Sequence, residues 1–510
     1  MKVVLSAVPL LDEVSGALVP IAMDARKVAP PLGVYLLKAE LLRHGHEVRV
    51  LDLISEGGVD LSAHGELLAG ADLIGVGSTS FSWPTARSFI EQAKRHAPEV
   101  PLVLGGIHAT MFDSHVLRTT RADFVVRGEG ELGLVELCEA LAGQRPLEQV
   151  TSLTWKTPEG ELRRNEVLRS VDLDRMPAPD YSDLPAASYQ GVSIESSRGC
   201  AFDYIFCSTN YRKTYRAMDP VGFVDKLEAS LPFLERTTQG SLHIIDDEFS
   251  LNVKRATQVV DEIVARGLSP RLVFDSRAND IARDEFIDKV APLIGRFLLG
   301  AECGYDEGLR RIGKGTTTDL LERAAARLNA NGVAHLADFS FVIGFPWESR
   351  EDVLNTISFA STLMVRHGVN ILLQWYVQIP GSRLWEEQRE EGIVHEALYD
   401  EFGLFRNPYL FRSGVRNFGL DDFYEVSELV ASLKRVHALS GTSRGNQIEY
   451  AHPLAIRRYF PRHEGRERER TGLNSLREVG PEALRKLRRK NREAARREPS
   501  DHVLTNADPR

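Results

Sequence analysis

Two cysteines and a tyrosine share one short loop, SSRGCAFDYIFCSTN, at residues 196–210. Cys200 and Cys207 have the spacing of two iron–sulfur ligands, and Tyr204 stands where the pattern C-x3-C-x2-C would place a third cysteine. Such clusters depend on thiolate ligands, whereas a phenol has a pKa of about 10 and is a harder, bulkier ligand. We therefore expect no competent [4Fe-4S] cluster here, with Cys200 and Cys207 as remnants of that site or ligands for another metal.

Few other thiols are available to replace the missing ligand, because the chain has four cysteines in all. Cys138 lies in an apolar helical pattern and is expected to pack in a core, the common fate of a free cysteine. Cys303 follows a strand-like run and faces either a cavity or the core. We keep Cys303 and Tyr204 as candidate catalytic residues.

Residues 1–145 alternate strand-like runs, such as HEVRVLDL and ADLIGVGST, with amphipathic helical patterns. This alternation predicts an α/β domain of the Rossmann-like, doubly wound kind, with a parallel sheet covered on both faces. Ligands of such sheets bind beyond the carboxyl ends of the strands. The residues predicted there are mostly small or polar and form a candidate site: Ser78, Thr79, Ser80, Trp83, Gly105, Gly106, His108, Gly128 and Glu129.

The βα rhythm returns over residues 191–395, where six strand-like runs are each followed by a helical pattern. This predicts a partial or full parallel (β/α) barrel with its chemistry at the carboxyl ends of the strands. Polar candidates at those ends are Asp246, Asp247, Arg277 and Glu302. The proline-rich segment 146–190 predicts a hairpin and linker, and residues 396–510 predict a helical region with a basic tail.

Bulk composition narrows the class of protein. The chain has 510 residues, 43% of them hydrophobic, and a net charge of -9, which argues against a chain-wide nucleic-acid footprint. Glutamates interleave with the arginines of the tail, so a solvated helix is favoured over an RNA-binding one. No apolar run is long enough to span a bilayer, and few cysteines suit a reducing compartment. We expect a cytoplasmic protein, with its oligomeric state open.

Several longer phrases resemble one known family, the cobalamin-dependent radical S-adenosylmethionine (SAM) enzymes. PPLGVYLLKAELLRHGHEVRVLDL, VPLVLGGIHAT and ADFVVRGEGE look like parts of its cobalamin-binding domain. IIDDEFSLN, LLGAECGYDEGLRRIGKGTT, FVIGFPWESREDVLNTI and VQIPGSRLWEE look like successive segments of its radical SAM domain. The resemblance spans about residues 1–400, and Tyr204 is where this chain departs from it.

The resemblance implies cobalamin as the cofactor of residues 1–145. The loop after the first strand, Ala7 to Gly33, contains no histidine, so the cobalamin is expected base-off with no histidine on its lower face. The residues from Ser78 to Trp83 would contact the corrin or its nucleotide, although Trp83 could equally pack between domains, and His108 could cap a helix. Asp246, Asp247, Arg277 and Glu302 mark where relatives bind SAM or substrate, so SAM binding stays open.

Loss of the cluster would remove the internal source of low-potential electrons. The sequence then favours redox-neutral carbon chemistry at cobalt, such as cyclisation, rearrangement, coupling or alkyl transfer, on a small organic metabolite. One alternative is a cobalamin-dependent radical SAM C-methyltransferase with an atypical cluster ligand. Another is a non-catalytic cobalamin-binding sensor, which the acids and arginine at the strand ends disfavour.

Overall fold

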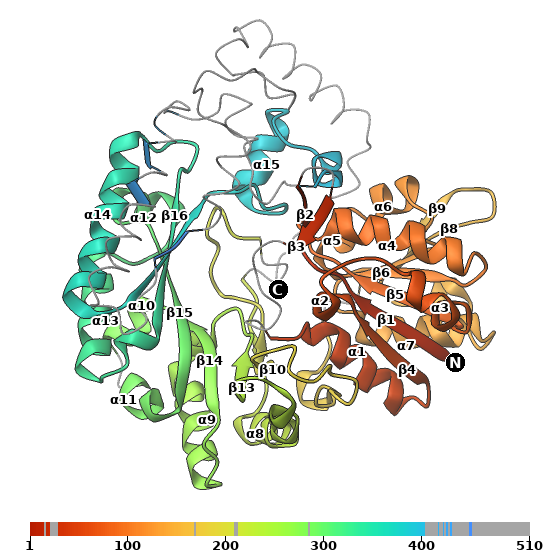
Figure 1. Ribbon diagram of the computed structural model, residues 1–510, viewed down its shortest axis with the longest axis horizontal. Helices are drawn as coiled ribbons and strands as arrows, with labels where there is room; N and C mark the ends of the chain where they lie inside the picture. The colour runs from red at the N-terminus through yellow and green to blue at the C-terminus, as the bar shows by residue number, and fades with distance from the viewer. Residues whose placement is uncertain are drawn as a thin grey trace, which may run out of the picture.

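The computed structural model describes residues 1–14, 17–20, 29–167, 170–208, 213–283 and 286–402, with strand β18 (Ile448–Tyr450) and a few isolated positions between 417 and 430. Within this part of the chain, two seven-stranded sheets lie side by side, each with its own helices (Figure 1). The basic tail and most of the predicted helical region 396–510 lie outside the described residues.

The first sheet has the strand order β4-β1-β5-β6-β7-β8-β9. Its first five strands are parallel, and β8 and β9 form an antiparallel hairpin at one edge, inside the segment where a hairpin was predicted. The strands are β1 (Lys2–Ala7), β4 (Glu47–Asp52), β5 (Leu73–Gly77), β6 (Leu102–Gly105), β7 (Phe124–Val126), β8 (Leu153–Lys156) and β9 (Leu162–Arg164). A separate small hairpin joins β2 (Leu11–Val14) and β3 (Ala17–Pro20).

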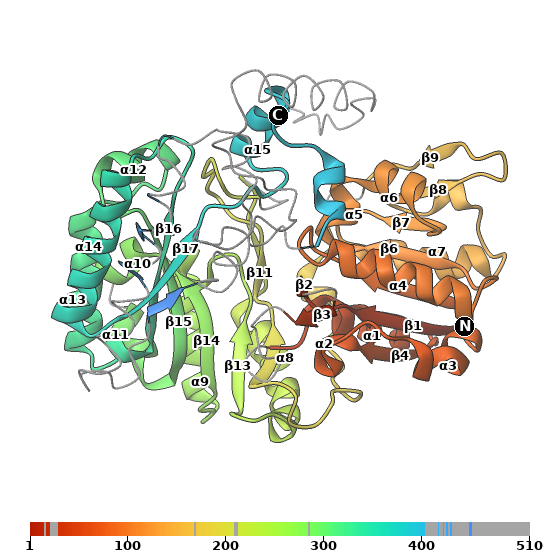
Figure 2. The ribbon, with the colours of Figure 1, turned by 45° about the horizontal axis from the view of Figure 1, so that its top comes forward.

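Helices cover both faces of this sheet (Figure 2). Val4 packs in one core with Phe89, and its neighbour Val3 packs in a second core with Leu137 on the other face. This follows from the strand period of two, which sends successive side chains to opposite faces. The helices are α1 (Leu32–Arg43), α2 (Leu53–Glu56), α3 (Gly65–Ala69), α4 (Trp83–His96), α5 (Gly106–Met111), α6 (Asp113–Thr119) and α7 (Gly130–Leu141). The predicted Rossmann-like fold is confirmed.

The second sheet is parallel throughout and runs in the order β10-β13-β14-β15-β16-β17-β18. All six strand regions predicted from the sequence are present, and the linear order is that of a partial barrel. The strands are β10 (Gly191–Ile194), β13 (Ser241–Ile244), β14 (Arg271–Ser276), β15 (Ile294–Glu302), β16 (Ala337–Ile343) and β17 (Asn370–Trp375). The helices are α8 (Pro220–Ser230), α9 (Val253–Ala265), α10 (Ala278–Arg283), α11 (Phe286–Val290), α12 (Asp306–Ile312), α13 (Thr318–Ala330) and α14 (Arg350–His367).

The two domains share contacts that fix their relative positions. Helix α15 (Arg383–Glu390) and the following 3₁₀ helix η9 (Glu396–Asp400) leave the barrel and pack on the first domain, where Trp385 and Tyr399 join its core. Asp400 accepts a hydrogen bond of 2.7 Å from the Trp83 indole. On the linker side, the Tyr189 hydroxyl donates to Asp52 at 2.7 Å. The domains are thus tied together at two places.

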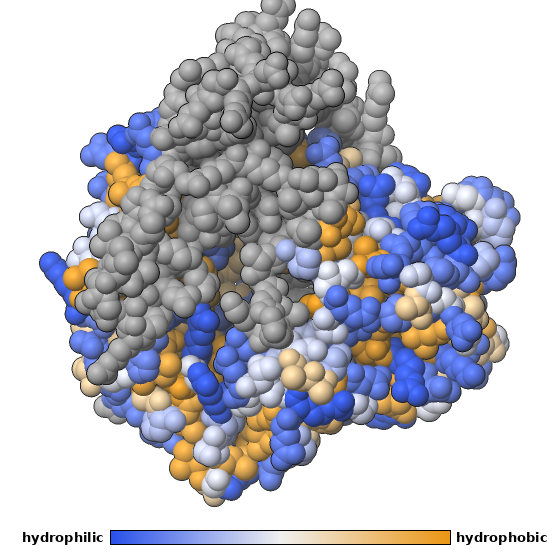
Figure 3. Space-filling model, in the orientation of Figure 1, coloured by the Kyte–Doolittle hydropathy of each residue, from blue (hydrophilic) through white to orange (hydrophobic). Residues whose placement is uncertain are grey.

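The described surface mixes hydrophilic and hydrophobic residues on the face seen in Figure 3. Among the described helices, none combines the length and the apolar character needed to span a bilayer.

Candidate cofactor and active site

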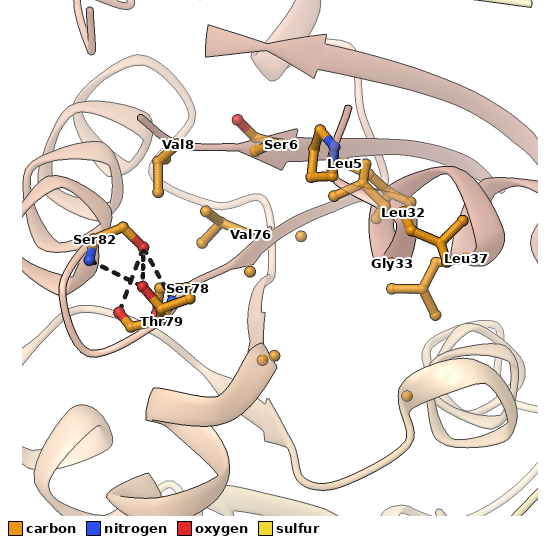
Figure 4. A pocket seen from close by; sticks show the side chains of 18 of the residues that line it. Leu5, Ser6, Val8, Leu32, Gly33, Leu37, Val76, Ser78, Thr79 and Ser82 are labelled. Atoms are coloured by element: carbon orange, nitrogen blue, oxygen red, sulfur yellow. Dashed lines mark hydrogen bonds between the residues drawn. The ribbon is translucent and has the colours of Figure 1, made fainter. Parts of the chain in front are cut away.

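A cavity of about 1060 Å³ opens at the carboxyl ends of β1, β5, β6 and β7. Leu5, Ser6 and Val8 line it from β1 and the turn that follows, and Leu32 and Leu37 line it from α1 (Figure 4). Residues of the second domain close the other side, namely Glu195, Arg198 and Ile245. The cavity therefore lies between the domains, at the sheet edge where the sequence predicted a ligand.

Small residues bring the strand-end loops close together. Gly106 has a φ of +85°, and a Cβ there would lie 2.6 Å from the Ser78 carbonyl oxygen, so only glycine fits without strain. The backbone N–H groups of Ser78 and His108 bond Gly105 and Ser78 respectively, each at 3.2 Å. Thr79 and Ser82 add reciprocal hydrogen bonds, which Figure 4 shows. These contacts fix the wall of the cavity.

Six of the predicted cofactor-binding residues line this cavity: Ser78, Thr79, Gly105, Gly106, Gly128 and Glu129. Three others lie behind its wall. His108 is fully buried, bonds the Ser80 hydroxyl through Nδ1 at 3.1 Å, and stacks on Trp83 with ring centres 4.5 Å apart. Burial lowers the pKa of His108 well below its ordinary value, so the ring is neutral. These three side chains support the wall from inside, where α4 packs against α5.

The cavity suits a large, flat ligand with a flexible tail, such as base-off cobalamin. Its lining is mostly apolar side chains, glycines and small hydroxyls, which let the backbone approach a ring closely. No histidine is among the lining residues in the described part of the chain. A cobalamin held here would meet the second domain at Glu195 and Arg198.

Four charged residues of the lining gather at the domain boundary: Glu129, Glu131, Glu195 and Arg198. We call this set the charged wall. The Arg198 guanidinium bonds Glu131 at 2.5 Å and Glu195 at 2.6 Å, and lies 3.4 Å from Glu129. Of the four, sequence reasoning singled out only Glu129, for its place at a strand end. One indication of Arg198 as a site residue was present in the sequence, namely its position two residues before Cys200.

The cysteine loop begins and ends on a short antiparallel pair, β11 (Ser197–Arg198) with β12 (Arg216–Ala217). Cys200 and Cys207 are both partly exposed and form no disulfide. Between them, the Tyr204 ring stacks on Phe202 and Phe206, with ring centres 5.6 and 6.3 Å apart. The Lys314 ammonium lies over the same ring, 4.5 Å from its centre. Tyr204 is thus a packed residue at the position of the third cysteine.

This loop offers two thiols, one fewer than the three that its cysteine pattern would supply to a [4Fe-4S] cluster. Burial raises the pKa of the Tyr204 phenol, although the charges of Lys314 and Arg277 oppose the rise. Across the described residues, no three His, Cys, Asp or Glu side chains group in a way that could hold a metal ion. Cys303 and Cys138 are fully buried in the hydrophobic cores of the second and first domains. Burial raises the pKa of the Cys138 thiol to about 12 and that of Cys303 well above its ordinary value.

The three acidic residues that follow β13 differ in their surroundings. Asp246 is buried and receives hydrogen bonds from the backbone and hydroxyls of Ser196 and Ser197, at 2.5 to 3.1 Å. It therefore fixes the start of the cysteine loop, and Asp247 lies exposed beside it. Glu248 is buried, accepts a hydrogen bond from Ser250 at 2.7 Å, and has a pKa raised to about 8, chiefly by burial.

Two predicted residues of the barrel mouth meet at Lys314, which sequence reasoning did not single out. Glu302 accepts a hydrogen bond of 2.9 Å from the Lys314 ammonium, and Arg277 donates to the Lys314 carbonyl at 3.2 Å. Glu302 has a φ of +63°, a strained conformation that clusters at functional sites. Arg277 also lies 3.8 Å from the centre of the Phe202 ring. The end of β14 thus contacts the cysteine loop directly through Arg277, and the end of β15 reaches it through Lys314.

Comparisons with known proteins agree with this architecture. Residues 19–138 match the B12 binding domain. An uncharacterized methyltransferase, PH0819, of Pyrococcus horikoshii is 32% identical over 374 residues, which cover 70% of this chain and 78% of that protein. The anaerobic magnesium-protoporphyrin IX monomethyl ester cyclase of Rubrivivax gelatinosus is 28% identical over 336 residues, which cover 62% of this chain and 58% of that protein.

Among solved structures, the radical SAM methyltransferase TsrM of Kitasatospora setae, with cobalamin and a [4Fe-4S] cluster bound, superposes with a TM-score of 0.59 at 20% identity. The match covers 77% of this chain and 78% of TsrM, and at that identity it establishes the fold. Fold, cavity and relatives together define a two-domain cobalamin-binding enzyme on a radical SAM scaffold. The chain belongs to the family of cobalamin-dependent radical SAM enzymes.

Proposed function

We propose that this enzyme binds cobalamin between its domains and carries out cobalt-centred carbon chemistry on a small organic substrate without a [4Fe-4S] cluster. The proposal depends on the position and packing of Tyr204. This residue occupies the position of the third cluster cysteine and is packed between Phe202 and Phe206 beneath Lys314. The half-buried ring is stacked on both neighbours and has a cation over its face, so packing holds it in this position.

The interdomain cavity supports cobalamin as the cofactor. Cobalamin supplies its own reactive metal centre, and the protein contributes position and surroundings. Gly105, Gly106 and Gly128 leave room for the ring system or its tail at the strand ends, and Ser78 and Thr79 offer hydroxyls at the same edge. The described lining places apolar side chains, rather than a histidine, around the rest of the ligand.

The barrel mouth supplies the groups that would hold substrate or SAM. Arg277 and Lys314 are cations beside the cysteine loop, and Glu302 and Glu248 are buried carboxyls at neighbouring strand ends. A raised pKa keeps Glu248 protonated near neutral pH, so it can donate a hydrogen bond to a substrate oxygen. We assign substrate contact to Arg277, Glu302 and Tyr204, and leave Asp247 as the exposed acid for a SAM amine.

Methyl transfer is the second candidate reaction. PH0819 is named an uncharacterized methyltransferase, and the hopanoid C-3 methylase of Methylococcus capsulatus is 27% identical over 315 residues. The similarity to the magnesium-protoporphyrin IX monomethyl ester cyclases supports ring formation as the other reaction. Formation of S-adenosylhomocysteine with a methylated product would select methyl transfer, whereas conversion of substrate with SAM unchanged would select rearrangement or cyclisation.

Restoration of the third cysteine tests the loss of the cluster. The variant Tyr204→Cys, reconstituted anaerobically with iron and sulfide, is expected to gain up to about four irons per chain. The matched variant Tyr204→Phe keeps the ring and is expected to stay at the wild-type iron content. If wild-type protein and Tyr204→Phe already carry a full complement of iron and sulfide, the proposal of a lost cluster is wrong.

A further inference from the structure

The charged wall gives the cavity one end whose chemistry differs from the rest. Apart from these residues, the described lining consists of apolar side chains, glycines, prolines and small hydroxyls. Glu129 is the N-cap residue of α7 in the first domain and Glu131 lies in the first turn of that helix, whereas Glu195 and Arg198 come from the start of the second domain. A ligand that fills the cavity must therefore present polar groups toward the domain boundary.

The carboxylates of the wall are held in fixed positions. Arg198 bonds both oxygens of Glu195 through Nε at 3.0 Å and reaches Glu131 at 2.5 Å. Glu129 accepts a hydrogen bond from the Val171 backbone N–H at 2.5 Å and another from the Arg216 guanidinium. The side chains of Glu129, Glu131 and Glu195 are 3%, 8% and 12% exposed, so solvent screens their charges poorly.

Acidic groups outnumber basic ones at this wall. Three carboxylates share the guanidinium groups of Arg198 and, behind the lining, Arg216. No lysine or histidine lines the cavity within the described ranges. A neutral group that both donates and accepts hydrogen bonds suits this setting, because its N–H can reach a carboxylate and its carbonyl can accept from Arg198. A further carboxylate would meet like charges in a desolvated place.

We propose that the charged wall receives side-chain amides of the corrin ring and selects a corrinoid with intact amides over one that carries a free carboxylate at that edge. The inference rests on the proposed function, since it takes cobalamin as the occupant of the cavity. Selection arises from repulsion as much as from attraction, which is the usual way to reject a close analogue. Glu131 and Glu195 are the acceptors, and Arg198 positions them.

The test is an absorbance titration of the cofactor-free, full-length protein at pH 7. The probes are cobalamin, the separated monocarboxylic acids made by hydrolysis of one propionamide, and the methyl ester of each acid. We expect at least one acid to bind about tenfold or more weakly than cobalamin. Its neutral methyl ester should recover part of that loss, because the ester removes the charge and keeps the carbonyl acceptor but has no N–H to donate to Glu131 or Glu195.

Two variants assign the effect to the wall. Glu131→Gln and Glu195→Gln should each reduce the preference for cobalamin over the discriminated acid, and Glu66→Gln, on the exposed surface of α3, should leave it unchanged. Equal binding of cobalamin and every acid would overturn the inference, as would an unchanged preference in both wall variants. If a variant does not fold, the affinities of the wild-type protein for the acid and for its methyl ester still test whether the negative charge weakens binding. Failure of cobalamin itself to bind would overturn the proposed function as well.

Discussion

The Lys314 ammonium lies 4.5 Å from the centre of the Tyr204 ring and 2.9 Å from a carboxylate oxygen of Glu302. One buried cation thus covers the residue at the third cysteine position and neutralises an acid at the barrel mouth. Because the cation, the ring and the acid depend on one another, Tyr204 belongs to a packed unit that links the cysteine loop to β15.

Removal of Lys314 is expected to destabilise the barrel. The variant Lys314→Met leaves Glu302 buried without its cation, which typically costs about 3–5 kcal/mol. Lys289→Met breaks a pair with Asp261 whose side chains are 49% and 56% exposed, and should cost less than about 1 kcal/mol. Urea unfolding of the two variants measures both values. Equal losses in the two variants would show that Lys314 has no structural role.

Two glycine substitutions distinguish the effect of backbone strain from the effect of a smaller cavity. Gly106→Ala forces a Cβ against Ser78 at a positive φ, so we expect both lower stability and weaker cobalamin binding. Gly77→Ala meets no atom within 4 Å and should fold normally, yet it narrows the cavity that Gly77 lines and should weaken cobalamin binding alone. Thermal unfolding and cobalamin titration distinguish the two. A Gly106→Ala protein as stable as wild type would contradict the assigned strain.

Glu248 predicts a pH dependence of stability. Its folded-state pKa is raised to about 8, chiefly by burial, whereas an unfolded glutamate titrates near about 4.3. The folded state therefore keeps a proton that the unfolded state loses, so stability falls as pH rises between these values. Glu248→Gln, which cannot titrate, should be less sensitive to pH between about 6 and 8 than wild type or Glu66→Gln. Parallel stability curves for wild type and Glu248→Gln would refute the shift.

The sequence predicted the sheet edge well, because the carboxyl ends of parallel strands must meet. Gly105, Gly106 and Gly128 converge on one cavity for that reason. Periodicity also predicted both domains, since strands buried on two faces read as continuous apolar runs. The six barrel strands were predicted on the same grounds, and the hairpin was predicted from the polar, proline-rich segment 146–190; both are present.

Side-chain direction was harder to predict than strand position. Ser80, Trp83 and His108 lie near the expected loops, but packing of α4 against α5 turns them into the wall. Asp246 bonds a neighbouring loop that only the folded chain brings near. Arg198 pairs with the distant Glu131 as well as with its neighbour Glu195, and Lys314 pairs with the distant Glu302; such distant pairs leave no pattern in the spacing of the sequence.

The most direct test of the central claim is the cobalt, iron and sulfide content of the anaerobically purified wild-type protein after reconstitution with cobalamin, iron and sulfide, read with its visible spectrum. We expect about one cobalt per chain, a base-off spectrum and negligible iron and sulfide. About four irons and four sulfides per chain, alongside cobalt, would contradict it and make this enzyme a cluster-bearing member of its family.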